Sequence, residues 1–264
     1  MTSPLTPRPS CYDHPRYYEI AFSFRDLSHE VDVIQQTIES FAGREVSSLL
    51  QLGCGPCQHM AELSRRGLRF EGLDINPAML DYSRDKAASA GIAATFHLQS
   101  MVDFRLTQPV DYVFIALGDL YVQSTDELKS LLRCVAAALR QGGLFLLDWC
   151  VQFEPARMFK AEGDRWEMAQ GDVRLSAHVV MQPFDHPHQL FREQLDIDVV
   201  DGQTQLSLSS HSVKRAVYPQ ELLELVSGMG LFEFVGWWND WNLDQPLGAT
   251  TDAIYRPITL LRRV

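Results

Sequence analysis

The sequence predicts an α/β fold, in which a doubly wound, seven-stranded and mostly parallel sheet carries an inserted antiparallel β cap. Three observations predict this fold. Short apolar runs alternate with segments of helical periodicity between residues 48 and 150, as in a parallel sheet with helices on both faces. The apolar run 49–52 ends in a glycine-rich turn, as a buried parallel strand does before its crossover helix. Between residues 164 and 217, polar and apolar residues alternate along several runs, which favours antiparallel strands.

The elements of the first half start with a helix. Apolar residues recur at helical spacing over 27–41 and Gly43 follows as a helix stop, so we expect a helix there. Asn76 before Pro77 marks another helix start, and Gly91 ends that helix. The elements expected after the first helix are strand 48–53, helix 57–66, strand 69–74, helix 77–90, strand 93–98, strand 111–117, helix 125–140 and strand 144–150.

After Cys150 the pattern changes to strands that follow one another directly. Asp201-Gly202 lies between two alternating runs and is a hairpin signal. The runs that predict this antiparallel insertion are 173–179, 195–199 and 206–208. A helix from 218 to about 229 and two closing strands, 231–238 and 253–263, complete the seven-stranded sheet.

The turn at the end of the first strand permits two chemistries. Gly53 and Gly55 have no Cβ, so their backbone N–H groups can approach a nucleotide-like ligand. Alternatively, Cys54 and Cys57 form a dithiol of the thioredoxin type, whose thiolate is stabilised by a helix N-terminus. Asp74 favours the nucleotide, because an acid about twenty residues past such a turn holds ribose hydroxyls in a βαβ unit.

The expected nucleotide has one ribose and no pyrophosphate. The dinucleotide fingerprint G-x-G-x-x-G requires a third glycine where this chain has Gln58, which argues against NAD. With these features, the chain resembles the class I S-adenosylmethionine-dependent methyltransferases. The motifs that carry the resemblance occur in the family's order, and they are Gly53-x-Gly55, the segment GLDINPAML at 72–80 and the segment LRQGGL at 139–144.

The resemblance implies a Rossmann-like core that binds S-adenosyl-L-methionine and releases S-adenosyl-L-homocysteine. It places the glycine turn beside the methionine portion and Asp74 on the ribose. It also implies that Ile75 and Met79 flank the adenine. The cofactor-binding residues implied in this core are Gly53, Cys54, Gly55, Asp74, Ile75, Met79, Ser100, Met101, Leu117 and Gly118.

The chain departs from the family's pattern at three positions. Gln51 stands where Asp or Glu is usual, Cys57 where a third small residue is usual, and Ser100 where an Asp is usual. Gln51 can donate and accept hydrogen bonds, but it provides no negative charge for the sulfonium and ammonium groups. A protein that binds the cofactor without transferring its methyl group is therefore an alternative.

The resemblance also implies how the chain is organised. Small-molecule members of the family cover the acceptor with a cap and fold an N-terminal lid over the methionine end. Tyr18 and Arg25 are candidates in the lid, since a guanidinium binds a carboxylate through two parallel hydrogen bonds. The expected parts are an N-terminal lid segment (1–26), a cofactor-binding core (27–150), an antiparallel insertion that serves as acceptor cap (151–217), and a C-terminal helix with the last two strands (218–264).

The acceptor side offers aromatic residues and histidines. A pocket rich in tryptophan suits an aromatic or cationic acceptor, although aromatic runs usually belong to the core. A histidine has a pKa near working pH and can act as a general base, although histidines in alternating strands often face solvent. The substrate-binding candidates are Trp149, Trp237 and Trp238, and the candidates for a catalytic role are Tyr18, His178 and His211. No metal site is expected.

The chain has 264 residues, of which 46% are hydrophobic. This length and composition indicate a soluble enzyme with one large core. A net charge of −11 leaves no basic face for phosphates, so nucleic acid is not an expected partner. No apolar run is long enough for a membrane span, and no signal peptide is evident, so we expect a cytoplasmic protein without a membrane partner. Five scattered cysteines suit free thiols in a reducing compartment.

The sequence therefore predicts an enzyme that transfers a methyl group from S-adenosylmethionine to an oxygen or nitrogen atom of a small-molecule acceptor. Two alternatives stay open. One is a cofactor-binding protein of the same fold without methyl-transfer activity, and the other is a dithiol oxidoreductase that uses Cys54 and Cys57. The identity of the acceptor and the oligomeric state do not follow from the sequence.

Overall fold

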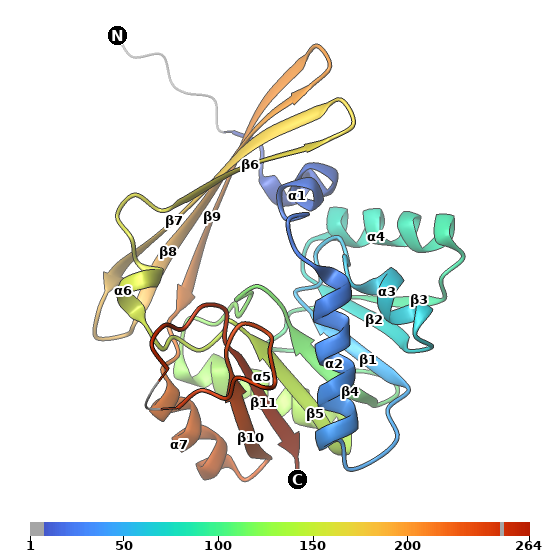
Figure 1. Ribbon diagram of the computed structural model, residues 1–264, viewed down its shortest axis with the longest axis vertical. Coiled ribbons are helices and arrows are strands. Elements are labelled where there is room, and N and C mark those ends of the chain that lie inside the picture. Colours follow the sequence, from blue (N-terminus) through green and yellow to red (C-terminus); the bar gives the residue numbers. More distant parts are fainter. Residues whose placement is uncertain (1–7, 249–250) are drawn as a thin grey trace.

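The structure, a computed structural model, describes residues 8–248 and 251–264 and contains two separate β-sheets (Figure 1). The strands of the larger sheet are β1 (Ser48–Leu52), β2 (Arg69–Asp74), β3 (Ala94–Leu98), β4 (Val110–Ile115), β5 (Leu139–Asp148), β10 (Phe232–Trp238) and β11 (Ile258–Arg263). Their order is β10-β11-β5-β4-β1-β2-β3. Neighbours pair in parallel except at β11, which runs antiparallel to both β10 and β5. The predicted fold class is confirmed.

Helices cover both faces of this sheet, as the alternation predicted. They are α2 (Leu27–Phe41), α3 (Met60–Arg65), α4 (Pro77–Ala90), α5 (Thr125–Ala138) and α7 (Pro219–Met229). Successive residues of a strand point to opposite faces. Leu49 accordingly packs in a buried cluster with α2, α3 and α4, whereas Leu50 packs in another with α5 and α7. Within the described residues, no helix is both long and apolar enough to cross a membrane.

Local signals determine where α4 begins and ends, and they explain why α3 starts later than predicted. The Asn76 side chain accepts hydrogen bonds from the first turn of α4, and Gly91 ends the helix in a left-handed conformation. Between β1 and α3, by contrast, Gly53, Gly55 and Cys57 all have positive φ. The chain therefore turns repeatedly before it becomes helical, and the prediction of a helix from Cys57 was wrong.

Strand β5 also begins earlier than predicted. It starts at Leu139, directly after α5, where helix was expected to 140. Gly142 lies within the strand with a φ of 75°, although glycine commonly ends a helix. The pairing of β4 with β5 shifts register between Val110 and Tyr112, so this end of β5 is irregular.

The smaller sheet is antiparallel and forms the insertion. Its strands are β6 (Asp164–Gln170), β7 (Val173–Asp185), β8 (Leu190–Asp201) and β9 (Thr204–Arg215), paired in that order. The strands are longer than the predicted runs, and β6 was not among those runs. Gly202, with a φ of 60°, makes the turn between β8 and β9, so the hairpin signal is confirmed. We call these four strands the cap sheet.

The N-terminal segment lies between the cap sheet and α4 (Figure 1). It contains a short 3-10 helix, η1 (Cys11–Asp13), and α1 (Pro15–Ala21). The indole Nε1 of Trp166 in the cap sheet donates a 2.6 Å hydrogen bond to the carbonyl of Ala21. On the other side, Asn76 Nδ2 donates to Asp13 Oδ1 at 3.0 Å. The segment thus joins the cap sheet to the core.

Candidate functional site

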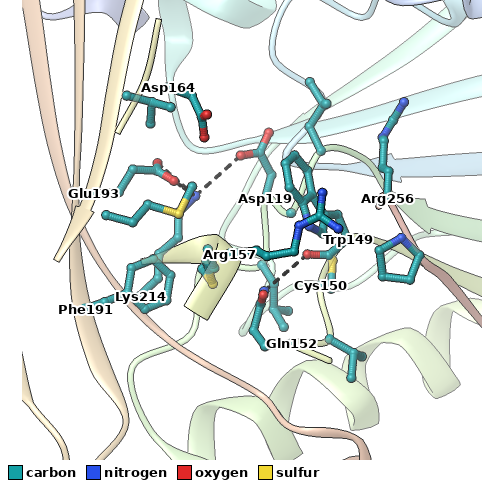
Figure 2. Close-up of a pocket in the computed structure, with 18 of the residues that line it drawn as sticks. Asp119, Trp149, Cys150, Gln152, Arg157, Asp164, Phe191, Glu193, Lys214 and Arg256 are labelled. Carbon is teal, nitrogen blue, oxygen red and sulfur yellow. Dashed lines mark hydrogen bonds and ion pairs between the residues drawn. The ribbon is translucent and has the colours of Figure 1, made fainter. Parts of the chain in front are cut away.

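A cavity of about 460 Å³ lies between the carboxyl ends of the core strands and the cap sheet. Figure 2 shows part of its lining. Its walls come from the N-terminal segment, the connections after β4 and β5, the cap sheet, and the loop before β11, whereas Gly53, Gly55 and Asp74 are not among the lining residues. The lining includes Tyr18, Asp119, Trp149, Glu193, Lys214 and Arg256.

The glycine turn lies at the carboxyl end of β1. Gly53 and Gly55 have φ values of 57° and 49°, a conformation that favours glycine. A Cβ on Gly53 would lie 3.3 Å from Met101 Cε and 3.7 Å from Asp119 Cβ. The backbone of this turn is therefore close to the side chains that follow β3 and β4.

Asp74, at the end of β2, is joined to the glycine turn. Its carboxylate accepts hydrogen bonds from the N–H groups of Gly55 at 2.8 Å and Asn76 at 2.9 Å, one on each oxygen. Burial raises the pKa of Asp74 above its ordinary value, although these N–H groups oppose the shift. Each carboxylate oxygen has a second lone pair, so Asp74 retains capacity for a hydroxyl donor.

The cofactor-binding residues expected after β2 and β3 differ in exposure. The Ile75 side chain is 70% exposed, although it is large and apolar, so it offers a surface for a flat ligand. Met79 and Met101 are buried. The Ser100 hydroxyl accepts a 3.4 Å bond from the N–H of Val102, so it serves as a turn residue in this structure.

The bend after β4 is fixed to the end of β5. Leu117 and Gly118 have φ values of 57° and 69°. The N–H of Leu117 donates to Asp148 Oδ2 at 2.6 Å, and the N–H of Gly118 donates to the Asp148 carbonyl at 2.9 Å. This bend brings Asp119 toward the glycine turn.

The cysteines of the turn are poorly suited to redox chemistry. Cys54 and Cys57 are both buried and free. Burial raises the pKa of the Cys54 thiol well above its ordinary value, and the neighbouring Cys57 thiol raises it further. Helix α3 starts only after Cys57, so the expected helix N-terminus is not at this thiol. The structure thus removes the helix-based reason for the dithiol alternative.

The two lid candidates have different environments. The Tyr18 ring lies 4.0 Å from where a Cβ on Gly55 would be, so it covers the glycine turn. Arg25, expected to bind a cofactor carboxylate, is instead paired with Glu30 in the core, and its side chain is only 3% exposed. Because Glu30 already binds this guanidinium through both of its oxygens, the expectation for Arg25 is corrected.

Glu30 is the centre of a buried ionic network at the edge of the cavity. It pairs with Arg25, with His59 Nε2 at 2.7 Å and with Arg256 Nη1 at 2.6 Å. Burial by itself raises the pKa of Glu30, but His59, Arg25 and Arg256 hold it below its ordinary value. Arg256 also pairs with Asp148, so the network connects α2 to β5 and to the loop before β11.

Of the acceptor candidates, only Trp149 lines the cavity. Trp238 is 7% exposed and packs on Phe41, with 5.3 Å between ring centroids, so it belongs to the core. Trp237 packs against Phe153 and Phe234 and is not itself a lining residue, although Phe153 is. Both tryptophan expectations are therefore corrected.

The two candidate histidines also lie outside the lining. His178 Nε2 is 3.0 Å from the Glu162 carbonyl, on the cap sheet. His211 is exposed and lies near Ser209. As strand alternation allows, neither points into the cavity, and both expectations for a general base are corrected.

A charged cluster that the sequence analysis missed lies in the cavity wall (Figure 2). Lys214 Nζ, from β9, is 2.9 Å from Glu193 Oε1 on β8 and 3.7 Å from Asp119 Oδ1 on the core side. The ammonium also lies 4.2 Å from the centroid of the Tyr121 ring. Tyr12 OH is 3.0 Å from Tyr121 OH, so the N-terminal segment completes this wall.

Comparison with known protein families identifies the central part of the chain. Residues 49–143 match the family described as "Methyltransferase domain". These residues form a methyltransferase domain. The domain includes the glycine turn, Asp74 and the bend at 117–118, and the family resemblance expected from the sequence is confirmed.

The methyltransferase domain has curated relatives of modest identity. The chain is similar to dTDP-3-amino-3,4,6-trideoxy-alpha-D-glucopyranose N,N-dimethyltransferase of Streptomyces venezuelae, with 28% identity over 141 residues, or 52% of this chain and 56% of the relative. It is also similar to carboxy-S-adenosyl-L-methionine synthase of Campylobacter lari, with 24% identity over 143 residues, or 53% of this chain and 60% of the relative. The chain spans somewhat over half the length of these relatives.

Solved structures resemble the methyltransferase domain together with its cap sheet. One is an S-adenosylmethionine-dependent methyltransferase from Clostridium acetobutylicum, with a TM-score of 0.75, 16% identity and coverage of 96% of this chain and 99% of that one. Another is CalS10, an amino pentose methyltransferase from Micromonospora echinaspora with S-adenosylmethionine bound, with a TM-score of 0.70, 18% identity and coverage of 94% and 96%. At these identities the likeness establishes the fold.

The methyltransferase domain contributes Asp119 to the charged cluster, and two signals in the sequence point to this cluster. Asp119 directly follows Leu117 and Gly118, two of the expected cofactor-binding residues. Glu193 lies two residues from Phe191 and two residues from Leu195, which are both buried. Because side chains alternate along a strand, Glu193 points to the same inward face. A charged residue at such a position needs a partner or a ligand.

Proposed function

We propose that this chain binds S-adenosylmethionine at the carboxyl ends of β1, β2 and β4 and transfers its methyl group to an oxygen or nitrogen atom of a small molecule held under the cap sheet. In this proposal Gly53 and Gly55 accommodate the methionine portion and Asp74 binds the ribose. Ile75 flanks the adenine, and Tyr18 covers the turn. The parts of the chain keep the roles expected above, with the N-terminal segment as lid and the insertion as acceptor cap.

The observation that carries the proposal is the bond between the glycine turn and Asp74. The N–H of Gly55 donates to Asp74 Oδ2 at 2.8 Å, so the turn and the acid hold each other in position. A nucleoside needs both at once, a backbone without Cβ atoms for close approach and a carboxylate for its hydroxyls. The exposed Ile75 side chain, directly after Asp74, suits the flat base of the same nucleoside.

In this proposal, the main task of the protein in the reaction is to position the acceptor atom relative to the methyl group. When bound, S-adenosylmethionine supplies a methyl group on a positively charged sulfur that is already activated for transfer. The cavity beside the turn would hold the acceptor atom in line with this methyl group and exclude water. Alignment of this kind can contribute about 7–11 kcal/mol to lowering a barrier. The Asp119 carboxylate, next to Gly53, adds negative charge that favours binding of the positively charged cofactor.

A second candidate function is cofactor binding without methyl transfer. Gln51 is buried and its amide oxygen has no hydrogen-bond partner among the described residues, and it provides no charge where the family usually has an acid. The two candidates differ in turnover. Production of S-adenosylhomocysteine with any member of a panel of amines and alcohols supports the enzyme, and binding without product across the panel supports the alternative.

Asp74→Ala tests the binding site. The variant loses the carboxylate that bonds to Gly55 and, in the proposal, to the ribose, so the affinity for S-adenosylmethionine should fall about 10- to 100-fold, the effect of losing a hydrogen bond to a charged group. Isothermal titration calorimetry measures this. The matched control is Asp85→Ala, an exposed acid on α4 that should leave the affinity unchanged. If Asp74→Ala binds as tightly as Asp85→Ala, the cofactor does not lie at this turn.

The location of the protein also belongs to this proposal. All five cysteines are free, which agrees with a reducing compartment and with the expected cytoplasmic location.

A further inference from the structure

The charged cluster joins the core to the cap sheet at the centre of the cavity wall. Asp119 projects from the connection after β4, and Glu193 and Lys214 project from neighbouring cap strands. Figure 2 shows the Asp119 carboxylate directed across the cavity toward Lys214. Three charges from two layers of the fold therefore meet where an acceptor would lie.

The two carboxylates of the cluster differ in the hydrogen bonds that they accept. Glu193 receives hydrogen bonds from Lys214 at 3.0 Å and from the Ser212 hydroxyl at 3.3 Å. For Asp119, the nearest cation in the described structure is Lys214 at 3.7 Å, which is too long for a hydrogen bond, and no described side chain or N–H donates to its carboxylate. Asp119 thus faces the cavity with its acceptor capacity unused.

The charges around Asp119 leave an excess of negative charge. Two carboxylates share one ammonium, and the side chains on the other packed elements are the phenols of Tyr12, Tyr18 and Tyr121, with Asp74 and Arg25 farther away. Burial raises the pKa of Asp119 to about 7, Lys214 opposes this shift, and Glu193 and Asp74 add to it. An additional cation in the cavity would relieve the excess.

Asp119 is also next to the proposed position of the methyl group. Its Cβ lies 3.7 Å from where a Cβ on Gly53 would be, and it directly follows the bend at Leu117 and Gly118. A ligand atom bound by this carboxylate would therefore lie beside the glycine turn. Lys214 is held by Glu193 and cannot take that place without losing its closer partner.

We propose that the methyl acceptor is an amine, and that Asp119 binds its ammonium form and removes one proton before transfer. This inference rests on the proposed function. The ammonium gives one proton to the Asp119 carboxylate, which becomes a neutral acid, and the amine regains its lone pair. The lone pair then forms the new N–CH₃ bond as the S–CH₃ bond breaks, and the electron pair of that bond stays on sulfur, which becomes a neutral thioether.

An amine suits this site better than a hydroxyl for reasons of charge and acidity. A hydroxyl is neutral and does not offset the second carboxylate. An alkyl ammonium has a pKa of about 10, as in lysine, whereas an unactivated hydroxyl such as that of water has a pKa of about 16. A base with a pKa of about 7 removes a proton from the former far more readily. Asp119 is therefore matched to an amine acceptor.

The test compares two probes of equal shape, cyclohexylamine and cyclohexanol. Both are titrated by calorimetry into wild-type protein saturated with S-adenosylhomocysteine, near neutral pH. Wild type should bind the amine about 10- to 100-fold more tightly than the alcohol, since the amine gains a charge-assisted hydrogen bond. Asp119→Asn has the same shape without the charge and should lose this preference. Asp126→Asn, an exposed acid on α5, is the matched control and should keep it.

The outcomes separate this inference from the proposed function. If S-adenosylhomocysteine binds but the amine shows no advantage over the alcohol, or if neither probe binds, the inference fails while the cofactor site stands. The same holds if Asp119→Asn keeps the preference. If S-adenosylhomocysteine itself does not bind, the proposed function fails first. The wild-type comparison needs no variant, so the inference is tested even if Asp119→Asn does not fold.

Discussion

Residues in a left-handed conformation gather where the core strands end. Cys57, Leu117 and Trp149 have φ values of 48°, 57° and 55°, although none is glycine. This conformation costs an L-residue about 1–2 kcal/mol, so surrounding contacts must hold each one in place. For Leu117, the hydrogen bond from its N–H to Asp148 does so. Backbone strain of this kind often occurs at binding sites, which agrees with the proposed positions of cofactor and acceptor.

Gly118→Ala should destabilise the protein more than Gly91→Ala. Both glycines have positive φ, 69° and 64°, so both variants carry backbone strain. At Gly118 the new Cβ would also lie 3.1 Å from the Trp149 carbonyl oxygen, whereas at Gly91 it would meet nothing within 4 Å. We expect Gly118→Ala to lower the free energy of unfolding by about 1 kcal/mol more than Gly91→Ala, by urea denaturation. Equal losses would mean that the Trp149 carbonyl moves away from the new Cβ without a cost in free energy.

Among the secondary-structure elements, the link between α2, β5 and the loop before β11 depends on one buried carboxylate. Glu30→Gln leaves Arg25 and Arg256 without their shared partner. We expect the free energy of unfolding to fall by about 3 kcal/mol, because breaking a buried ion pair leaves uncompensated charge. Glu39→Gln, on the exposed side of the same helix, is the control and should change it by less than about 0.5 kcal/mol.

The same substitution should show a dependence on pH. Although burial opposes it, the pKa of Glu30 in the folded protein is held below its ordinary value of 4.5 by His59, Arg25 and Arg256. A carboxyl group whose pKa is lowered on folding stabilises the fold above its unfolded pKa, and loses this effect as pH falls toward its folded pKa. The difference in unfolding free energy between wild type and Glu30→Gln should therefore shrink below pH 4.5. A constant or growing difference would contradict the network.

The sequence predicted the elements whose signals are local. Helix α4 and strand β2 have the predicted bounds, and for the helix Asn76 and Gly91 mark the two ends. The start of α3 was missed because Cys57 adopts a left-handed conformation that its residue type does not favour. The start of β5 was missed because Gly142, a common helix stop, lies within an irregular strand.

The candidate site divides in the same way. The glycine turn and Asp74 belong to one βαβ unit, so their spacing predicted that they would meet, and Gly55 does bond to Asp74. Asp119, Glu193 and Lys214 come from distant segments, and only the register of the cap strands brings them together. Arg25 pairs with Glu30 and is therefore not available to a cofactor carboxylate. Its residue type alone did not indicate which carboxylate it would bind.

Across the whole molecule, the core, the cap sheet and the N-terminal segment enclose the cavity jointly. Helix α1 has only seven residues. A helix this short is marginal alone, so its order depends on contacts with its neighbours. Those contacts include the Trp166 hydrogen bond from the cap sheet and the bond from the Tyr82 hydroxyl on α4 to Glu19, at 2.6 Å. The segment that covers the glycine turn is thus held at both edges and has little structure of its own.

Binding of S-adenosylmethionine should therefore slow amide hydrogen exchange in α1. A ligand at the glycine turn would contact the Tyr18 ring, which lies 4.0 Å from a Cβ on Gly55, and would add a third attachment to this helix. At a ligand concentration 100 times Kd, amides that exchange only from the unliganded state should slow about 100-fold, which corresponds to about 2.7 kcal/mol. Helix α7, which packs on β10 and lies far from α1 at the opposite end of the molecule (Figure 1), should not change. If α1 exchanges at the same rate while calorimetry shows the ligand bound, the N-terminal segment does not close over the cofactor, and the cavity would then be covered by the cap sheet alone.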